Sequence, residues 1–421
     1  MNAVDTVVVG AGHAGLAMSA HLTADGRDHV VLDRGRTAER WRSERWDSLR
    51  LLTPNWMVRL PGSDYDGPDP DGYMTALALA ELLDRYAAAF RQPVVQNTTV
   101  LAVQAADEGY RVVTDADTWQ AANVVVATGA CDVPAVPAVA DRLHPSITQL
   151  TPPAYRNPAR LPPGGVLVVG ASASGLQIAD ELRRAGREVV LATGSHTRLP
   201  RRYRGMDVMW WLEATGVLDR SVDDVPDPAR ARREPSLQLV GRRDATDLDL
   251  GTVSAAGVRV TGRLTALDGA VACFDASLGD SARIADDRLR RLLTRIDDHA
   301  AATGLDREVG EPDPPPPLHL PDGIDRLDLP AAGVRTVVWA TGYRRDHRWL
   351  PAPALNEHGE LRQRYGITPL PGLFTVGQRF QTRRSSTFVG GSRNDAALIA
   401  AHLDTVRPAR RRAGVALRGR S

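Results

Sequence analysis

One short stretch near the N-terminus constrains the fold more than any other part of the chain. An apolar run ending at Val9 leads directly into Gly10, Gly12 and Gly15, which have the Gly-x-Gly-x-x-Gly spacing. A helical pattern follows, and the next apolar run ends in Asp33. Strand, glycine turn, helix, strand and acid in this order predict a dinucleotide-binding unit of an α/β fold.

Each residue of this fingerprint has its own expected role. Gly10 allows a tight turn, Gly12 lets the backbone approach a pyrophosphate, and Gly15 lets the helix pack closely on the strand. The free N–H groups and the positive dipole end of the helix favour the phosphates. Asp33 is expected to accept a hydrogen bond from a ribose hydroxyl.

The same pattern returns near the middle of the chain with two changes. A second apolar run leads into Gly170 and Gly175, and Ser172 stands in place of the middle glycine, with Ser174 in the same turn. The acid after the following strand is replaced by Ala192-Thr193. The segment beyond it carries guanidinium groups, of which the candidates are Arg198, Arg201 and Arg202. Loss of the acid and gain of arginines favour the 2′-phosphate of NADP over NAD.

Composition excludes several classes of protein. The net charge of +1 over 421 residues argues against a general nucleic-acid binder. Cys131 and Cys273 form no Cys-x-x-Cys motif, which argues against a disulfide reductase and a secreted disulfide scaffold. No apolar run has transmembrane length, no histidine pair has metal-ligand spacing, and the first strand leaves no room for a signal peptide. We therefore expect a cytoplasmic enzyme without a metal site or a membrane or nucleic-acid partner.

Two nucleotide sites imply hydride transfer between two carriers, and FAD is the obvious partner for NADPH. Both apolar strands that follow the turns end in Ala-Thr-Gly, at Thr128-Gly129 and at Thr341-Gly342. The second of these predicts a return to the first domain. The expected division is an FAD-binding domain over residues 1–160 and 331–406, with an NADPH-binding domain over 161–330 inserted into it. The basic tail 407–421 is expected to be disordered.

These motifs together resemble the class B flavin-dependent monooxygenases, which include auxin-forming, N-hydroxylating and Baeyer–Villiger enzymes. The resemblance spans nearly the whole chain and includes the 45–49 segment Arg-Trp-Asp-Ser-Leu, Thr-Pro-Asn at 53–55, and Pro-Arg-Arg-Tyr-Arg-Gly at 200–205. It implies two Rossmann-like domains, FAD in the first and NADPH in the inserted one.

Carried over by position, the resemblance also implies individual contacts. Val100 would face the adenine, Arg40, Trp41 and Trp46 would lie near the flavin end, and Gly377 and Gln378 would contact the flavin. Asn55 is a tentative catalytic residue near flavin and NADP. The full set of expected cofactor-binding residues is Gly10, Gly12, Gly15, Asp33, Arg34, Arg40, Trp41, Trp46, Thr53, Val100, Thr128, Gly129, Gly170, Ser172, Ser174, Gly175, Arg198, Arg201, Arg202, Thr341, Gly342, Gly377 and Gln378.

The activity that the resemblance implies is monooxygenation of a small organic substrate. NADPH reduces FAD, O2 adds at flavin C4a, and the hydroperoxide delivers one oxygen atom. One departure concerns the linker, where Thr151 stands at the usual histidine position and Tyr155 fits the pattern. A flavin oxidoreductase or oxidase without a stable peroxide, and a non-catalytic nucleotide-binding protein, therefore stay open, as do the oligomeric state and the substrate. We expect the substrate pocket between residues 41–61, 203–213 and 378–388, with a planar or anionic ligand.

Overall fold

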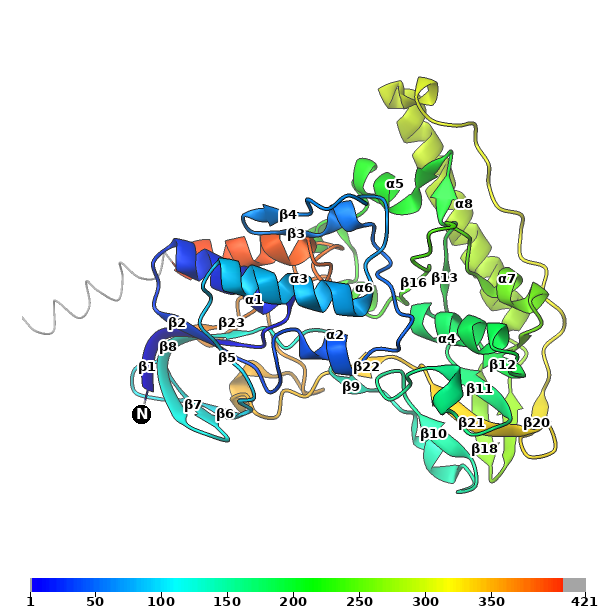
Figure 1. The fold of residues 1–421 in the computed structure, drawn as a ribbon, viewed down its shortest axis with the longest axis horizontal. Helices are drawn as coiled ribbons and strands as arrows, with labels where there is room; N and C mark the ends of the chain where they lie inside the picture. Colours follow the sequence, from blue (N-terminus) through cyan, green and yellow to red (C-terminus); the bar gives the residue numbers. More distant parts are fainter. Residues whose placement is uncertain (1, 404–421) are drawn as a thin grey trace, which may run out of the picture.

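The structure is a computed structural model that describes residues 2–403. Two α/β units lie next to each other along the long axis, and the chain passes from the first to the second and back again (Figure 1). The predicted α/β architecture with two Rossmann-like dinucleotide-binding units is confirmed.

The first unit is built on a seven-stranded sheet with the order β5-β2-β1-β8-β7-β6, in which β23 also pairs with β8. Its strands are β1 (Asn2–Val9), β2 (His29–Leu32), β5 (Val94–Val95), β6 (Val100–Ala105), β7 (Tyr110–Thr114), β8 (Thr118–Val126) and β23 (Leu373–Thr375). Strands β5, β2, β1, β8 and β23 are parallel, whereas β6 and β7 form an antiparallel meander. The carboxyl ends of the parallel strands therefore meet at one edge.

Helices α1 (His13–Ala24) and α3 (Ala76–Ala89), together with the helix of residues 391–403, cover one face of this sheet (Figure 1). Side chains along β1 point alternately to the two faces of the sheet, which explains why the unit has a core on each face. Val8 packs with these helices, whereas Val7 and Val9 join a core on the opposite face. This opposite core is closed by segments from residues 349–373. Each buried strand of the unit thus stabilises two layers at once.

The second unit is built on a five-stranded parallel sheet with the order β10-β21-β11-β12-β17. Its strands are β10 (Thr148–Leu150), β21 (Val334–Trp339), β11 (Gly165–Val169), β12 (Val189–Ala192) and β17 (Arg259–Thr261). Helices α4 (Ala173–Arg184) and α7 (Leu250–Ala255) pack on one face. An antiparallel sheet of β18 (Leu264–Asp268), β19 (Val271–Phe274) and β20 (Arg326–Asp328) packs on the other.

A helical extension joins the two units. Helix α8 (Leu278–Thr303) packs on α5 (Val208–Ala214) in a core that also contains Met57 of the first unit. The remaining short elements are α2 (Glu39–Ser43), α6 (Pro228–Arg232), β3 (Arg59–Leu60), β4 (Ser63–Asp64), β9 (Val133–Pro134), β13 (Thr197–Arg198), β14 (Arg202–Tyr203), β15 (Met206–Asp207), β16 (Leu237–Gln238), β22 (Tyr343–Arg344) and the 3-10 turns Asn55–Met57, Ala138–Arg142, Pro158–Arg160, Val222–Asp224, Leu305–Arg307 and Ala352–Ala354.

The domain boundaries differ from the prediction at both crossings. Strand β21 pairs with β11 and β10, so the Ala-Thr-Gly strand before Gly342 belongs to the second sheet and not to the first. Strand β10 also lies in the second sheet, although the prediction placed residues up to 160 in the first domain. The two crossings run side by side where β9 pairs antiparallel with β22. We call this pair of strands the hinge. The predicted disordered tail 407–421 lies outside the described residues.

Candidate functional site

The first glycine turn connects β1 to α1 and has the geometry that a dinucleotide phosphate requires. Gly10 has a φ of +112°, and a Cβ on this residue would lie 2.6 Å from the Ala127 carbonyl oxygen. A Cβ on Gly15 would lie 1.8 Å from the Gly10 carbonyl oxygen, so α1 can pack on β1 only with glycine here. Gly12 differs, because a Cβ there would meet no protein atom within 4 Å. The backbone at Gly12 is therefore open to a ligand beside the N-terminus of α1.

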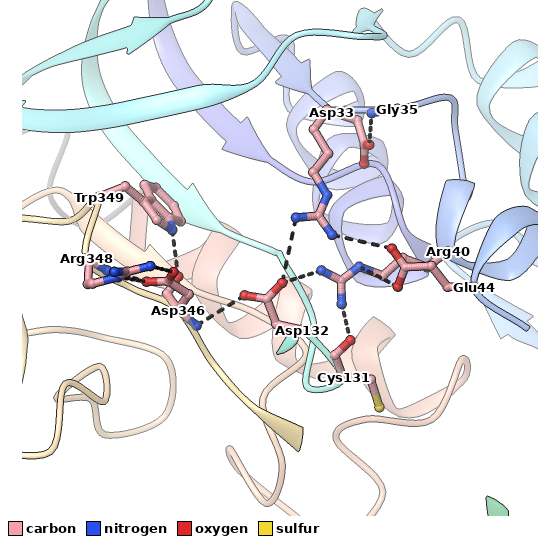
Figure 2. Close-up of polar contacts among 10 residues, drawn as sticks. Asp33, Gly35, Arg40, Glu44, Cys131, Asp132, Asp346, Arg348 and Trp349 are labelled. Carbon is pink, nitrogen blue, oxygen red and sulfur yellow. Dashed lines mark hydrogen bonds and ion pairs between the residues drawn. The ribbon is translucent and has the colours of Figure 1, made fainter. Parts of the chain in front are cut away.

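Asp33 lies at the end of β2 and braces the same turn. Its carboxylate accepts hydrogen bonds from the backbone N–H groups of Ala11 at 2.6 Å and Gly35 at 2.9 Å; Figure 2 shows the second. The carbonyl oxygen of Asp33 accepts from the N–H of Thr98 at 2.8 Å, which brings Val100 to this end of the sheet. The half-buried carboxylate thus stands where a ribose of a nucleotide on the first turn would lie.

The carboxyl ends of β8 and β23 lie next to the first turn. Thr375 of β23 pairs with Val126 of β8, and the chain then turns at Gly377, whose φ is +76°. Gln378 follows and is 3% exposed; its Nε2 donates to the Thr375 hydroxyl at 3.0 Å. Its Oε1 is buried and has no hydrogen-bond partner among residues 2–403. A buried acceptor without a donor is costly, so this atom fits a ligand group that donates a hydrogen bond. Thr128 and Gly129, half-buried, end β8 at the same edge.

Arg40 connects the first turn region to the hinge. Its guanidinium donates to the Cys131 carbonyl oxygen and to the Asp132 carboxylate (Figure 2). Asp132 also accepts from the backbone N–H of Asp346 at 3.1 Å, so one carboxylate joins both strands that cross between the units. Arg34 is 54% exposed and approaches the same carboxylate at 3.9 Å. Arg40 therefore positions the hinge, which is a structural role in place of the predicted contact at the flavin end.

The two tryptophans predicted to lie near the flavin, Trp41 and Trp46, pack in the cores of different units. Trp41 packs on the core of the first unit, and the Arg45 guanidinium lies 5.1 Å from its ring centroid. Trp46 is 5% exposed and packs in the core of the second unit with Tyr155. The indole of Trp46 is thus enclosed by apolar side chains of the other unit, and its place near the flavin stays a prediction.

Asn55 braces two loops. Its Nδ2 donates to the Asp69 carbonyl oxygen at 2.8 Å, and its Oδ1 accepts from the Met74 N–H at 2.8 Å. The side chain is 5% exposed, and Thr53, two residues earlier, is half-buried. Both polar atoms of Asn55 are thus engaged within the protein, and the geometry supports a structural role for this residue.

The second glycine turn repeats the first. Gly170 has a φ of +107°, and a Cβ on it would lie 2.4 Å from the Ala340 carbonyl oxygen. A Cβ on Gly175 would lie 1.8 Å from the Gly170 carbonyl oxygen. Ser172 is the N-cap residue of α4, but its side chain makes no capping hydrogen bond, and Ser174 is half-buried. The turn and its hydroxyl groups are therefore arranged for a second phosphate-bearing ligand.

The strand end that faces the second turn also takes part in the hinge. The Thr341 hydroxyl donates to the Ala135 carbonyl oxygen at 2.7 Å, and Gly342 has a φ of +94°. Thr341 therefore fastens the second sheet to the segment that leaves the first.

Two of the three predicted 2′-phosphate arginines are already paired. Arg198 is 5% exposed and binds the carboxylates of Asp249 at 2.7 Å and Asp286 at 2.6 Å. Arg201 is fully buried, pairs with Asp207, and lies over the Tyr73 ring at 5.0 Å. Both arginines connect segments of the fold, and their positive charges are compensated, which leaves no free guanidinium for a phosphate.

Arg202 is exposed and lines a recess of about 470 Å³ with Arg242 and Arg243. The arginine that does lie at the end of β12 is Arg263. Its guanidinium approaches within 3.6–3.9 Å of the position that a Cβ would take on Gly194, two residues beyond β12. Arg263 is exposed and forms no ion pair within residues 2–403. Sequence reasoning missed it because it follows β17, and only the strand order places β17 beside β12.

His13 is a second residue that sequence reasoning left without a role. It is the first residue of α1, and burial of its ring lowers its pKa to about 4, so the ring is neutral near pH 7. A hydrogen bond with the Thr387 backbone partly offsets this shift. His13 thus connects the first turn to the C-terminal segment that follows Gln378.

A cleft of about 600 Å³ lies between the two units. Trp56 and Arg59 line it from the first unit, and Met206, Trp210 and Glu213 line it from the second. Arg59 and Glu213 form an ion pair at 2.8 Å. Two of the three segments predicted to form the substrate pocket, 41–61 and 203–213, line this cleft, whereas residues 378–388 are not among its lining residues. Trp211 is fully buried beside the cleft.

Two further findings concern residues 2–403. They contain no group of three or more His, Cys, Asp or Glu side chains that could hold a metal ion. None of their helices combines the length and the apolar character that a membrane crossing requires.

Comparison with known sequences identifies relatives along the whole chain. Residues 7–214 match the family model described as pyridine nucleotide-disulphide oxidoreductase. An uncharacterized CzcO-like oxidoreductase of Geobacillus kaustophilus is 30% identical over 400 residues, which cover 93% of this chain and 96% of the relative. The probable indole-3-pyruvate monooxygenase YUCCA4 of Arabidopsis thaliana is 30% identical over 210 residues, 48% of this chain and 49% of that protein.

Solved structures show the same fold. A flavin-containing monooxygenase from Stenotrophomonas maltophilia superposes with a TM-score of 0.62 at 20% identity and covers 96% of this chain and 99% of its own. OTEMO in complex with FAD and NADP superposes with a TM-score of 0.56 at 15% identity, over 96% and 84% of the two chains. The predicted oxidoreductase agrees with the CzcO-like relative, and the two cofactors bound in the OTEMO structure, FAD and NADP, are those predicted for this chain. The chain belongs to the family of CzcO-like oxidoreductases.

Proposed function

We propose that this protein is an FAD-dependent, NADPH-consuming monooxygenase that transfers one oxygen atom from O2 to a small organic substrate. The observation that carries the proposal is the pair of matching glycine turns, one in each unit, with Gly12 and Ser172 at equivalent positions. Two dinucleotide sites in one chain are needed when a hydride passes from a nicotinamide to a flavin.

The first turn suits FAD. The backbone at Gly12 would hold the pyrophosphate, and the Asp33 carboxylate would accept a hydrogen bond from the ribose. The buried Gln378 Oε1 would accept a hydrogen bond from the flavin end of the cofactor. When bound, FAD would accept a hydride from NADPH and then react with O2.

The second turn suits NADPH. Ser172 and Ser174 would hold its pyrophosphate at the N-terminus of α4. No acid follows β12, and Arg263 lies beside Gly194 without an ion pair to any of the residues 2–403. An unpaired guanidinium in this place favours a 2′-phosphate, because it offers a planar fork of donors to the phosphate oxygens.

The rest of the chain would bind the substrate and exclude water. The cleft between the units brings Trp56 and Trp210 together, and these aromatic side chains are suited to a planar molecule. The hinge, held by Arg40 and Asp132, fixes how the two cofactor-binding units are connected. The chain thus supplies binding and orientation, since the cofactors carry the redox chemistry.

Anaerobic titration of the FAD-loaded protein with NADPH tests this proposal. We expect NADPH to bleach the flavin absorbance, and NADH to do so with a much weaker apparent affinity. Reoxidation under ¹⁸O2 with a panel of small aromatic compounds should then place one labelled atom in a product. Flavin that NADPH never bleaches would refute the proposal and leave a non-catalytic nucleotide-binding protein. Reduction followed by release of all the oxygen as H2O2 would instead indicate an oxidase, the function that Thr151 at the linker position keeps open.

A further inference from the structure

Three arginines from separate segments converge beside Cys131, close to the end of β23. Arg345 follows β22, and because Arg344 pairs with Val133 of β9, Arg345 lies level with the residues just before β9. Arg379 follows Gln378 directly, and its Nη2 donates to the Glu234 carbonyl oxygen at 2.5 Å. That bond brings in the segment after α6, whose last residue is Arg232. We call Arg232, Arg345 and Arg379 the arginine cluster.

Arg345 lies within electrostatic range of the other two arginines. Burial lowers the pKa of each, and the charges of Arg379 and Arg232 lower the pKa of Arg345 further. Cys131 interacts with both Arg345 and Arg379, and Figure 2 shows its sulfur directed away from the Arg40–Asp132 ion pair. The cluster therefore lies on the far side of Cys131 from that ion pair.

The arginines of the cluster are half-buried and form no ion pair among the described residues, although two of their nitrogen atoms are fully buried. The Nε atoms of Arg232 and Arg345 are buried without a hydrogen-bond partner, and neither side chain forms an ion pair within the described part of the chain. The acidic groups that act on the cluster are Glu360 and Glu234, and both are exposed. Glu234 is moreover paired with Arg384 at 3.2 Å.

His347, close to Arg345, adds an uncharged hydrogen-bond donor to the cluster. It is 1% exposed, and neither ring nitrogen has a hydrogen-bond partner within residues 2–403. Burial and the charge of Arg345 lower its pKa to about 4, although Asp132, Asp346 and Glu360 oppose this shift. Near pH 7 the ring is therefore neutral and carries one N–H.

Other buried arginines of this chain provide an internal comparison. Arg198, Arg201 and Arg204 are each at least 95% buried, and each binds one or two aspartates. This is the usual arrangement, because an unpaired buried charge costs several kcal/mol. The absence of such partners from the arginine cluster indicates that an anion supplied from outside completes it.

We propose that the arginine cluster binds the carboxylate of the substrate, and that the substrate is a small organic acid. Planar guanidinium forks match the two oxygens of a carboxylate. Arg379 adjoins Gln378, the residue assigned above to the flavin end of FAD, so a carboxylate on the cluster would hold the rest of the molecule near the reacting ring. This inference rests on the proposed function, since only then does a substrate bind here.

Calorimetric titration of the FAD-loaded protein with benzoate and with benzamide tests the proposal. We expect benzoate to bind and benzamide to bind at least tenfold more weakly. Arg345→Met and Arg379→Met should each weaken benzoate binding at least tenfold, and Arg345→Lys should weaken it less. Arg344→Met is the matched control, because Arg344 is the exposed neighbour on the same strand and points to the other face; it should bind benzoate as the wild type does.

Two further measurements separate the possible failures. Arg345→Met should keep or raise the thermal midpoint, because it removes an unpaired buried charge; a clear loss would show that Arg345 has a structural partner and would overturn the proposal. Equal binding of benzoate and benzamide, or competition by inorganic sulfate as effective as benzoate itself, would also overturn it. NADPH bleaching of the flavin is recorded on the same samples. Bleaching without benzoate binding refutes the carboxylate site alone, whereas benzoate binding without bleaching refutes the proposed monooxygenase.

Discussion

Replacement of Gly12 by alanine tests whether the first turn holds a phosphate. Gly12 has a φ of −80° and a ψ of −179°, which alanine also adopts without strain. A Cβ there would meet no protein atom within 4 Å. The added methyl group therefore lies in the space assigned to the pyrophosphate of FAD and disturbs nothing else.

The expected effect on stability is small because two terms oppose each other. Gly12 is the N-cap of α1, and alanine is a poor N-cap, which costs about 1 kcal/mol. Alanine also restricts the unfolded chain, which contributes about 0.4–1 kcal/mol in the opposite direction. The free energy of unfolding of the apoprotein should thus change by less than about 1 kcal/mol.

The expected effect on FAD affinity is large. A hydrogen bond from a backbone N–H to a charged phosphate contributes about 1.5–3 kcal/mol. If the methyl group displaces the pyrophosphate from two such bonds, the loss is at least about 3 kcal/mol, or a factor of more than about 100 in Kd. Fluorescence titration of the apoprotein with FAD measures this change, and urea unfolding measures the stability.

Two further variants complete the experiment. Gly279→Ala makes the same change in α8, also with no atom within 4 Å of the new Cβ, and should leave FAD affinity unchanged. Gly15→Ala would place a Cβ 1.8 Å from the Gly10 carbonyl oxygen and should destabilise the apoprotein strongly. An FAD Kd for Gly12→Ala within threefold of the wild type would refute the assignment of the pyrophosphate to this turn.

Three further substitutions have defined outcomes. Arg263→Gln should raise the apparent KM for NADPH at least tenfold and leave that for NADH unchanged, because only NADPH carries the 2′-phosphate; equal effects on both would contradict the assignment. Asp395 is fully buried, and burial raises its pKa to about 6. The unfolded carboxyl ionises near pH 4, so the folded protein loses up to about 3 kcal/mol as the pH rises from 4 to 6, and Asp395→Asn should remove this loss in urea unfolding. Arg198→Met leaves the buried carboxylates of Asp249 and Asp286 without their cation and should lower the free energy of unfolding by about 3–5 kcal/mol, whereas an unchanged midpoint would show that the pair contributes nothing.

The two glycine turns could be predicted because their signal is local. A few residues of sequence contain the strand, the three positions of the turn and the start of the helix, and the first and last glycines are required by contacts within that stretch or with one neighbouring strand. Gly15 and Gly175 show this directly, since a Cβ on either would meet the carbonyl oxygen of the first glycine of its own turn at 1.8 Å. The same holds for Asp33, which hydrogen-bonds the Ala11 N–H of the turn it follows.

The arginines could not be assigned because their partners are distant in sequence. Arg198 binds Asp249 and Asp286, which lie 51 and 88 residues further along the chain. An arginine whose guanidinium neutralises carboxylates of the fold and an arginine that is free to bind a phosphate cannot be told apart in the sequence. Arg263 shows the converse, because only the pairing of β12 with β17 brings it to the second turn.

The assignment of the second Ala-Thr-Gly strand failed for a different reason, and this reason explains the architecture. A Cβ on Gly10 would meet the Ala127 carbonyl oxygen, and a Cβ on Gly170 would meet that of Ala340. Each glycine turn thus requires its own Ala-Thr-Gly strand end within its own sheet. The repeat belongs to the dinucleotide-binding unit and marks no return to the first domain.

It follows that the two units are structurally equivalent in the glycine turns that we propose to bind phosphates and differ in the residues that we propose to select the nucleotide. The first ends its second strand in Asp33, and the second places Arg263 at the matching strand end. Within residues 2–403 the chain passes from one sheet to the other and back through the hinge, where Asp132 binds Arg40 and the Asp346 N–H. The arginine cluster begins at Arg345, next to Asp346. The geometry of the crossing therefore sets both the distance between the two cofactors and the place where a carboxylate would be held between them.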